Sequence, residues 1–338
     1  MRIAVITAIQ SGIDTLEMIR HRVKIDLVIG LDGQQVRDKV AGYVDVAEYC
    51  ERVDCRYMGV SAYSLNNELD RTRLLEEEID VLLVLGWQRL IPDWFIQHVK
   101  IAVLGGHGSA DGITAGRGRS PQNWALILGK PSFSIALFKI NAGVDSGPVL
   151  MERSFNYSVL DDIETSYYKT SWMMSEMIVE LLNSNDSTRF AGTPQTGEPK
   201  YFPKRTAEDG VIDWQQNSNR IFDFVRALTK PYPGAFTLAK ETSVAIWQAI
   251  PFELPIRMSR FQLGEICQTF LNGSFVVRTG DGFVLVREWS APEEWQPCNG
   301  LVFKSVSVTE TIKKIIDRHQ RETKGCALHA DITNFVKS

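Results

Sequence analysis

Residues 1–105 alternate short apolar runs with segments of helical pattern, and this alternation restricts the fold more than any other feature of the chain. Strands that alternate with helices indicate a parallel sheet with crossover connections. The apolar runs lack an in/out alternation, as expected when helices cover both faces of the sheet. We therefore expect an α/β fold with a Rossmann-like, mostly parallel sheet. The expected strands are Arg2–Thr7, Ile25–Gly30, Val81–Gly86 and Ile101–Gly105, and the expected helices are Ile13–His21, Asp45–Arg52, Leu65–Glu78 and Asp93–Val99.

The pattern changes in the second half of the chain. Two more strands (Ser132–Ile140 and Val149–Phe155) and a helix (Ile163–Leu182) precede the polar segment Asn183–Lys200, which has the composition of a linker. An amphipathic helix is expected near Ser218–Leu228. Closely spaced short strands then suggest a small antiparallel, OB-like barrel. These strands are Phe236–Leu238, Ser243–Ile250, Gly264–Thr269, Ser274–Arg278 and Phe283–Trp289, and a last helix is expected over Val306–Arg321.

Domain boundaries follow from these changes of pattern. We expect a first domain over residues 1–186, a linker over 187–205, the OB-like domain over 206–298 and a helical extension over 299–338. The final residues are expected to be loosely held.

Composition narrows the classes of function. The net charge is −4, from 37 Lys and Arg against 41 Asp and Glu, and no run of basic residues suggests a nucleic-acid partner. No stretch reaches about 18 apolar residues, which argues against a membrane-spanning helix. The N-terminus lacks the features of a signal peptide. The 5 cysteines form no CxxC pair and no ligand spacing with the 5 histidines, so we expect reduced thiols, a cytoplasmic protein and no metal site.

Candidate acid/base residues lie in the central stretch Leu104–Leu150. His107 is expected just beyond the strand that ends at Gly105, and Asp145 lies in the turn Gly143–Gly147. If both lie at neighbouring strand ends, a carboxylate can orient the imidazole and raise its basicity. Each residue alone also has an ordinary structural interpretation, as a histidine bonded to the backbone or as an aspartate in an Asx turn.

Two other features have both a functional and a structural interpretation. Arg117-Gly-Arg119 supplies positive charge on a loop, where it could hold an anionic substrate or simply be solvated. Trp87 could be an exposed platform for a pterin or a base, although an aromatic residue beside an apolar strand is more often core. The segment Thr7–Gly12 holds no GxGxxG, and no Walker motif occurs, so a nicotinamide or P-loop site has little support.

The motifs, taken in order, resemble those of the formyltransferases that use 10-formyltetrahydrofolate, a family that includes methionyl-tRNA formyltransferase and its sugar-nucleotide relatives. The likeness is greatest to the sugar-nucleotide N-formyltransferases, such as the formyltransferase domain of the lipid A aminoarabinose-modifying enzyme. It covers about residues 1 to 290. The matching motifs are His107-Gly-Ser109, Arg117-Gly-Arg-x-Pro-x-Asn-Trp124, Gly143-x-Asp-x-Gly147, Asp213-Trp, Val225-Arg-Ala and Pro231-Tyr-Pro-Gly-Ala-Phe236.

The resemblance implies roles for individual residues. It makes residues 1–186 the catalytic domain, His107 the catalytic acid/base and Asp145 its partner, with 10-formyltetrahydrofolate as formyl donor. It also implies that the substrate amine attacks the formyl carbon while polar groups of the site stabilise the oxyanion. Residues expected to bind the folate are Arg89, Leu90, Ile91, Arg119, Asn141, Ala142, Gly143 and Val144.

Two departures from the family pattern concern the catalytic centre. The family's catalytic asparagine, two residues before the histidine, is Gly105 here, and the loop after His107 is about two residues longer. Ser109 or a backbone N–H near Gly105 and Gly106 is a candidate replacement donor. If the site merely lacks a donor, Gly105→Asn should raise the rate; an unchanged or lower rate indicates a rebuilt site.

The sequence favours an amino sugar attached to a nucleotide as formyl acceptor. The chain is mildly acidic, the segment Gly30–Asp45 lacks the Lys/Arg-rich insertion expected of tRNA-acting relatives, and the Arg117-Gly-Arg119 loop matches the sugar branch more closely. Methionyl-tRNA remains the alternative acceptor. A catalytically impaired, folate-binding protein is the alternative of a different class, because Gly105 replaces the asparagine. The sequence leaves the sugar, the nucleotide and the oligomeric state open, a homodimer included.

Overall fold

The computed structural model describes residues 1–32, 40, 42–323 and 326–335. The chain divides into two compact units, and each is described by itself. The first consists of Met1–Arg117, Ser134–Phe155 and Tyr167–Glu198, and the second of Gly118–Phe133, Asn156–Ser166 and Pro199–Ser338. The chain passes between the two units five times, and the last passage, from Glu198 to Pro199, lies within the expected linker over 187–205.

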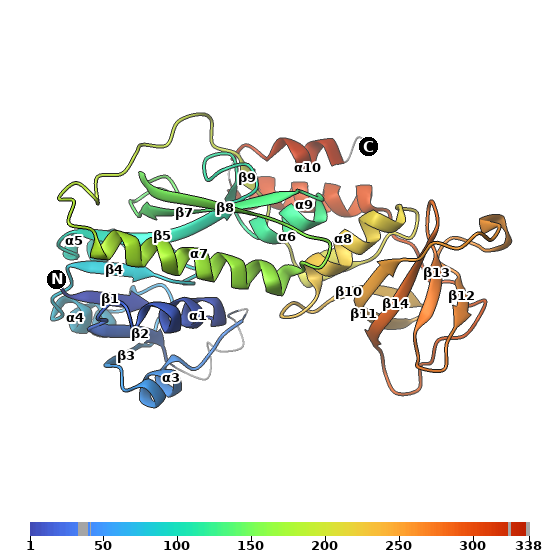
Figure 1. Cartoon of the computed structure of the whole chain (residues 1–338), viewed down its shortest axis with the longest axis horizontal. Helices are drawn as coiled ribbons and strands as arrows, with labels where there is room; N and C mark the ends of the chain where they lie inside the picture. The colour runs from blue at the N-terminus through green and yellow to red at the C-terminus, as the bar shows by residue number, and fades with distance from the viewer. Residues whose placement is uncertain (33–39, 41, 324–325, 336–338) are drawn as a thin grey trace. The chain divides into compact units, whose positions relative to one another are not determined.

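The first unit is built on a seven-stranded sheet of order β3-β2-β1-β4-β5-β7-β8 (Figure 1). The strands from β3 to β5 pair in parallel, whereas β7 pairs antiparallel with β5. The mostly parallel sheet predicted from the sequence is therefore confirmed. Its strands are β1 (Ile3–Ile6), β2 (Leu27–Leu31), β3 (Tyr57–Val60), β4 (Val81–Val84), β5 (Ala102–Ser109), β7 (Ser132–Lys139) and β8 (Val149–Asn156).

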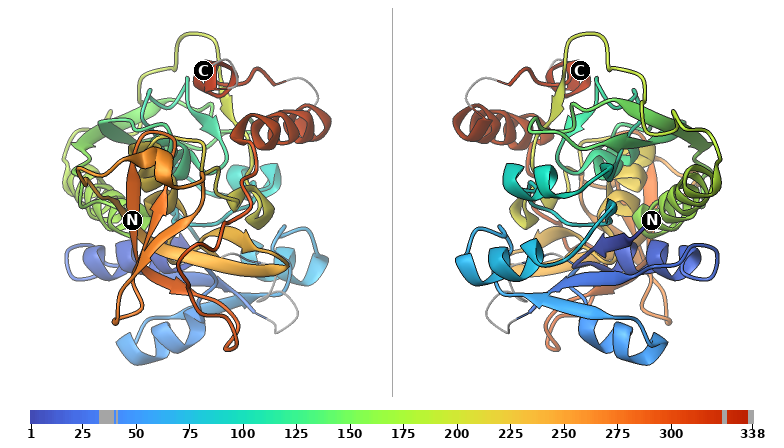
Figure 2. Two further views of the ribbon diagram at one scale, coloured as in Figure 1. Left: turned by 90° about the vertical axis from the view of Figure 1, so that its right-hand side faces the viewer. Right: turned by 90° about the vertical axis from the view of Figure 1, so that its left-hand side faces the viewer.

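Helices cover both faces of this sheet (Figures 1 and 2). On one face, side chains of α1 (Gln10–Ile19), α3 (Val46–Val53) and α7 (Ile163–Asn183) pack into one apolar cluster with alternate residues of the strands. On the other face, α4 (Glu68–Leu75) and α5 (Asp93–His98) pack into a second cluster. All four residues of β1 and of β4 are buried, because neither face of these strands meets water.

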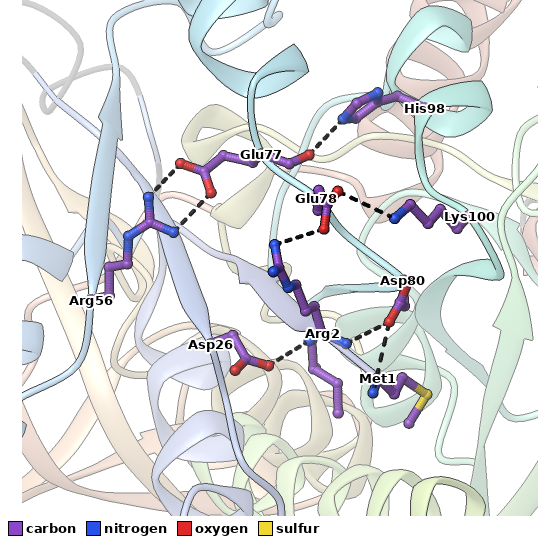
Figure 3. Close-up of polar contacts among 10 residues, drawn as sticks. Met1, Arg2, Asp26, Arg56, Glu77, Glu78, Asp80, His98 and Lys100 are labelled. Atoms are coloured by element: carbon purple, nitrogen blue, oxygen red, sulfur yellow. Dashed lines mark hydrogen bonds and ion pairs between the residues drawn. The ribbon is translucent and has the colours of Figure 1, made fainter.

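Charged groups surround the amino ends of the parallel strands (Figure 3). Asp26, directly before β2, accepts the backbone N–H of Ile3 at 2.9 Å. Asp80, directly before β4, accepts the backbone N–H of Arg2 at 2.6 Å. Arg56, just before β3, forms a bidentate pair with Glu77 at 2.5 and 2.8 Å. These carboxylates and the guanidinium are already paired, so this edge of the sheet has a structural explanation.

Two features of the sheet differ from the sequence-based expectation. The strand β3 was not expected, because its four residues include a glycine and form too short an apolar run to stand out. The strand expected to end at Gly105 continues to Ser109, so His107 lies inside β5 and not beyond it. Pairing with β4 does end at Gly105, and antiparallel pairing with β7 extends β5 through His107, opposite Ala136.

The second unit contains a five-stranded antiparallel sheet of order β10-β11-β14-β13-β12, which forms a half-barrel and confirms the predicted small antiparallel domain. Trp214 and Phe303 stack at 5.6 Å in its core, and Phe275 lies 6.0 Å from Phe303. The strands are β10 (Ala235–Ala239), β11 (Thr242–Pro251), β12 (Ile266–Thr269), β13 (Phe275–Arg278) and β14 (Phe283–Ser290).

The remaining elements of the second unit are mostly helices. They are the α-helices α6 (Pro121–Ile127), α8 (Ser218–Leu228), α9 (Val308–Thr323) and α10 (Ala330–Phe335), and the 3-10 turns η1 (Ala207–Gly210) and η2 (Met258–Arg260). Two short strands complete the list: β6 (Arg117–Gly118) at the boundary of the unit and β9 (Tyr201–Phe202) within it. The expectation that the final residues are loosely held falls partly on residues 336–338, which lie outside the described residues; before them, Ile332 of α10 is fully buried.

Among the described residues, no helix combines the length and the apolar character that crossing a membrane requires. Half of the segment Gly30–Asp45, on which the argument against tRNA partly rests, lies outside the described residues (33–39 and 41).

Candidate active site

The imidazole of His107 lies between two acceptor groups of the first unit. Its Nε2 is 2.8 Å from the carbonyl oxygen of Gly116, and its Nδ1 is 3.3 Å from Oδ2 of Asp145. The side chains of His107 and Asp145 are 10% and 24% exposed. The structure therefore brings the two predicted acid/base residues together.

The partners of the ring restrict its protonation. A carbonyl oxygen cannot donate, so His107 Nε2 must carry the hydrogen that Gly116 accepts. Asp145, an ionised carboxylate, can also only accept, and it faces the other ring nitrogen. Both ring nitrogens therefore face acceptors of the protein, and the two contacts fix the orientation of the ring. In this arrangement His107 is placed to donate a proton or to stabilise negative charge.

The turn between β7 and β8 frees the carboxylate of Asp145 for this contact. Asn141 Oδ1 accepts the backbone N–H of Gly143 at 3.1 Å and the hydroxyl of Ser146 at 2.8 Å. Asn141 thus forms the Asx-type interaction that was considered for Asp145. Asp145 itself has a left-handed backbone with φ of 48°, a conformation that Asp and Asn tolerate better than most residues.

Gln195, in the segment expected to be only a linker, holds this turn. Its Nε2 donates to the carbonyl oxygens of Asp145 and Gly147 at 2.7 and 2.8 Å. Its Oε1 accepts from Arg117 Nη2 at 2.7 Å and from Thr114 Oγ1 at 3.0 Å. No sequence signal distinguishes this glutamine from the other polar residues around it.

The interpretation of Arg117 as a loop cation for an anionic substrate is wrong. Arg117 is only 8% exposed, and Gln195 accepts its Nη2 hydrogen. A buried guanidinium that bonds a side chain of its own unit is a structural group. Arg119 belongs to the second unit, where its side chain is exposed and its backbone N–H donates to Phe202 at 3.0 Å.

Hydrocarbon fills the space beside Gly105 where a side chain would lie. A Cβ atom at this position would be 2.8 Å from Cδ1 and 3.1 Å from Cγ1 of Ile140, and 3.6 Å from the ring of Phe138. Gly105 and His107 are two residues apart in one strand, so their side-chain positions are on the same face. The place from which an asparagine at 105 would reach the centre is thus occupied by Ile140.

Ser109, the candidate replacement donor, serves the loop instead. Its side chain is 1% exposed, and its Oγ accepts the backbone N–H of Asp111 at 3.1 Å. A Cβ atom on Gly116 would lie only 1.6 Å from this Oγ. The absence of a side chain at 116 therefore lets the longer loop approach β5, where its carbonyl oxygen meets His107.

The segment expected to bind folate follows β4. The last residue of β4, Val84, pairs with Gly105, and Arg89, Leu90 and Ile91 come after four further residues. Leu90 is exposed, Ile91 is buried and the guanidinium of Arg89 lies 5.7 Å from the centre of the Tyr63 ring. Trp87 is only 7% exposed, so the idea of an exposed stacking platform is wrong. The other expected folate contacts, residues 141–144, are exposed in the turn.

Comparison with known families and structures follows the division of the chain. A family model described as "Formyl transferase" matches residues 1–182, and one described as "Formyl transferase, C-terminal domain" matches residues 204–303.

Among solved structures, HypX from Aquifex aeolicus in complex with tetrahydrofolic acid is 18% identical with a TM-score of 0.60; the match covers 94% of this chain and 47% of that one. The chain thus spans about half the length of HypX. The N-formyltransferase from Helicobacter canadensis, in complex with folinic acid and dTDP-3-aminofucose, is 14% identical with a TM-score of 0.58, covering 86% and 100%. Methionyl-tRNA formyltransferase from Clostridium thermocellum is 18% identical with a TM-score of 0.52, covering 74% and 92%. At these identities the likeness concerns the fold.

Proposed function

The chain belongs to the formyl transferase family, whose model matches 182 of its 338 residues, and from this premise we propose that it transfers a formyl group from 10-formyltetrahydrofolate to the amine of a nucleotide-linked amino sugar. The observation that carries the proposal is the contact of His107 with Asp145 at 3.3 Å, beside the end of the pairing between β4 and β5. An imidazole held by a carboxylate is the group that acyl transfer to an amine needs.

The first unit offers residues that fit the folate donor. Arg89, Leu90 and Ile91 follow β4, whose last residue Val84 pairs with Gly105, and the exposed turn Asn141–Val144 leads into Asp145. We assign these residues of the first unit to binding of the donor; Arg119, to which the resemblance gives the same role, belongs to the second unit. The bound donor supplies an activated formyl group.

In the proposed reaction, the amine forms a C–N bond to the formyl carbon while the bond from that carbon to the folate nitrogen breaks. The amine loses a proton and the folate nitrogen gains one. His107 takes up the proton that the amine loses and passes one to the folate nitrogen, and its N–H stabilises the charge that develops on the formyl oxygen; Asp145 keeps the ring oriented. With hydrocarbon from Ile140 beside Gly105, His107 has a larger share of this task than it would have next to an asparagine.

A sugar nucleotide is the acceptor that the observations support best. The net charge of −4 does not favour binding to the phosphate backbone of tRNA. The N-formyltransferase that binds dTDP-3-aminofucose is matched over its full length. The 5 cysteines are free thiols, in keeping with a cytoplasmic enzyme, which we also propose.

A folate-binding protein without transferase activity is the second candidate, and one observation favours it: the space for the catalytic amide is filled by Ile140. Mass spectrometry separates the two functions. The protein is incubated with 10-formyltetrahydrofolate and a panel of dTDP- and UDP-linked amino sugars, and we expect one acceptor to gain the mass of a formyl group. Binding of folinic acid without transfer to any acceptor would support the second candidate.

A further inference from the structure

We propose that Gln195 is a positioning residue, which sets the placement of Asp145 and of the Gly116 carbonyl around the imidazole of His107. The inference rests on the proposed function for its kinetic consequence only; its geometric content stands without it. Gln195 lies outside every motif that linked the sequence to its family.

The side-chain amide of Gln195 joins two separate segments of the first unit. Its NH₂ group bonds the turn that carries Asp145, at 2.7 and 2.8 Å. Its oxygen bonds Thr114 at 3.0 Å and Arg117 at 2.7 Å, on the loop that follows β5. Gly116 lies between these two residues and accepts the Nε2 hydrogen of His107.

These contacts form a closed ring. From one imidazole nitrogen it runs through Asp145 to Gln195, and from there through Arg117 to Gly116 and the other imidazole nitrogen. A displacement of the Asp145 turn or of the 114–117 loop therefore changes a partner of His107. A misplacement of about 1 Å at a reacting group can cost about 100-fold in rate.

The orientation of the amide is fixed by its partners. Two carbonyl oxygens face the NH₂ group, and they can only accept; a guanidinium faces the oxygen, and it can only donate. Flipping the amide would oppose donor to donor and acceptor to acceptor. Gln195 is thus a two-sided clamp, and a carboxylate at this position could hold only the side of Arg117 and Thr114.

The segment around Gln195 has an anchor of its own. Thr193 and Val149 exchange backbone hydrogen bonds of 2.7 and 2.8 Å, which attach the segment to the start of β8 without the glutamine side chain. Substitution of Gln195 should therefore leave the segment in place. Thr196, whose side chain is exposed, offers a matched control in the same segment.

The test uses the full chain with Gln195→Glu, Gln195→Ala and Thr196→Ala. The glutamate keeps the acceptor for Arg117 but removes both bonds to the Asp145 turn. We expect Gln195→Glu and Gln195→Ala to lower kcat by about 10- to 100-fold with 10-formyltetrahydrofolate and a dTDP-linked amino sugar, while the KM for the donor changes little. Thr196→Ala should match the wild type. If glutamate restored wild-type kcat, the role would be confined to holding Arg117, and the proposal would be wrong.

A second readout does not depend on activity. In protein labelled with ¹⁵N-histidine, the signals of His107 are assigned by their loss in His107→Ala. We expect Gln195→Glu and Gln195→Ala, but not Thr196→Ala, to shift the ring nitrogens of His107, since both Gln195 variants lose the two bonds to the turn that carries Asp145. Unchanged His107 signals in both Gln195 variants would overturn the proposal. If the wild type transfers no formyl group while these shifts occur, the proposed function fails and the clamp stands.

Discussion

A single missing side chain alters what the centre of this protein can do. At Gly105 no amide reaches the reacting atoms, and the position is closed by the aliphatic side chain of Ile140. Removal of one oxyanion donor typically costs about 100- to 1000-fold in rate. In the proposed reaction, His107 is then the side chain left to stabilise the negative charge on the formyl oxygen.

The contact with Ile140 predicts the effect of restoring the asparagine. Gly105→Asn should not raise kcat, and it should lower the free energy of unfolding by about 1–3 kcal/mol, because the new side chain overlaps Ile140. Adding Ile140→Ala should relieve the overlap and recover part of the stability. Urea denaturation and kcat of the single and double variants test this expectation. A single Gly105→Asn variant with raised kcat and unchanged stability would show that Ile140 yields easily and that the site only lacks a donor.

The charge of Asp145 can be removed without disturbing its backbone. Asp145→Asn retains a residue type that tolerates φ of 48°, whereas alanine at this position would add strain. We expect a loss of about two to four orders of magnitude in kcat, an unchanged circular dichroism spectrum and retained binding of folinic acid. Asp186→Asn, an exposed Asp substitution outside the site, should have wild-type kcat. An Asp145→Asn variant near wild-type activity would remove the carboxylate from the mechanism.

At the scale of elements, the sequence predicted those strands that are specified by burial of hydrophobic side chains. The apolar runs at Arg2–Thr7 and Val81–Gly86 became β1 and β4, because such runs are stable only between two helical layers. The extension of β5 through Gly105–Ser109 has no apolar pattern, since its pairing with β7 depends on residues distant in sequence. Gln195 could not be identified from the sequence for the same reason, because its role depends on four hydrogen-bond partners that only the folded chain brings together.

The connection between α1 and α3 predicts a dependence of stability on pH. Glu17 accepts a hydrogen bond from Tyr49 OH at 2.7 Å and two from Arg20 at 2.6 and 2.8 Å. The bond from Arg20 is the main cause that lowers the pKa of Glu17 to about 2 from its ordinary 4.5. A lowered carboxyl pKa stabilises the fold above pH 4.5, and this stabilisation is lost as the pH falls towards 2.

Glu17→Gln should therefore lower the free energy of unfolding by about 0.5–1 kcal/mol at pH 7, a small value because the carboxylate is partly exposed. The difference from the wild type should shrink as the pH falls below 4.5. Urea denaturation at pH 7 and at lower pH values measures it. Glu51→Gln, an exposed change on α3, is the matched control. A difference that stays constant over this range would mean that Glu17 acts through packing and not through its charge.

At the scale of the whole molecule, the two units differ in how much of the candidate chemistry they contain. His107, Asp145 and Gln195 belong to the first unit, which the N-terminal family model largely covers. The second unit includes the half-barrel and continues past the C-terminal match at residue 303, where Ile312 and Ile315 of α9 are buried. The C-terminal region beyond the match is thus part of a folded unit.

The charge of the molecule supports a last prediction, on the choice of acceptor. Binding of tRNA is favoured when many Lys and Arg side chains displace counterions from its phosphates, and a chain of net charge −4 is not suited to this. A sugar nucleotide presents only two phosphate groups, so its binding depends much less on the release of counterions. We expect no formylation of methionyl-tRNA at low or high salt. For a protein that makes about six phosphate contacts, affinity typically falls roughly 1000-fold when salt rises from about 50 to 200 mM. The kcat/KM for the sugar nucleotide should fall much less over the same range. A methionyl-tRNA formyltransferase serves as positive control for the tRNA. Formylation of methionyl-tRNA by this chain, with a steep dependence on salt, would instead assign it to the tRNA branch and would require a local basic surface that the net charge conceals.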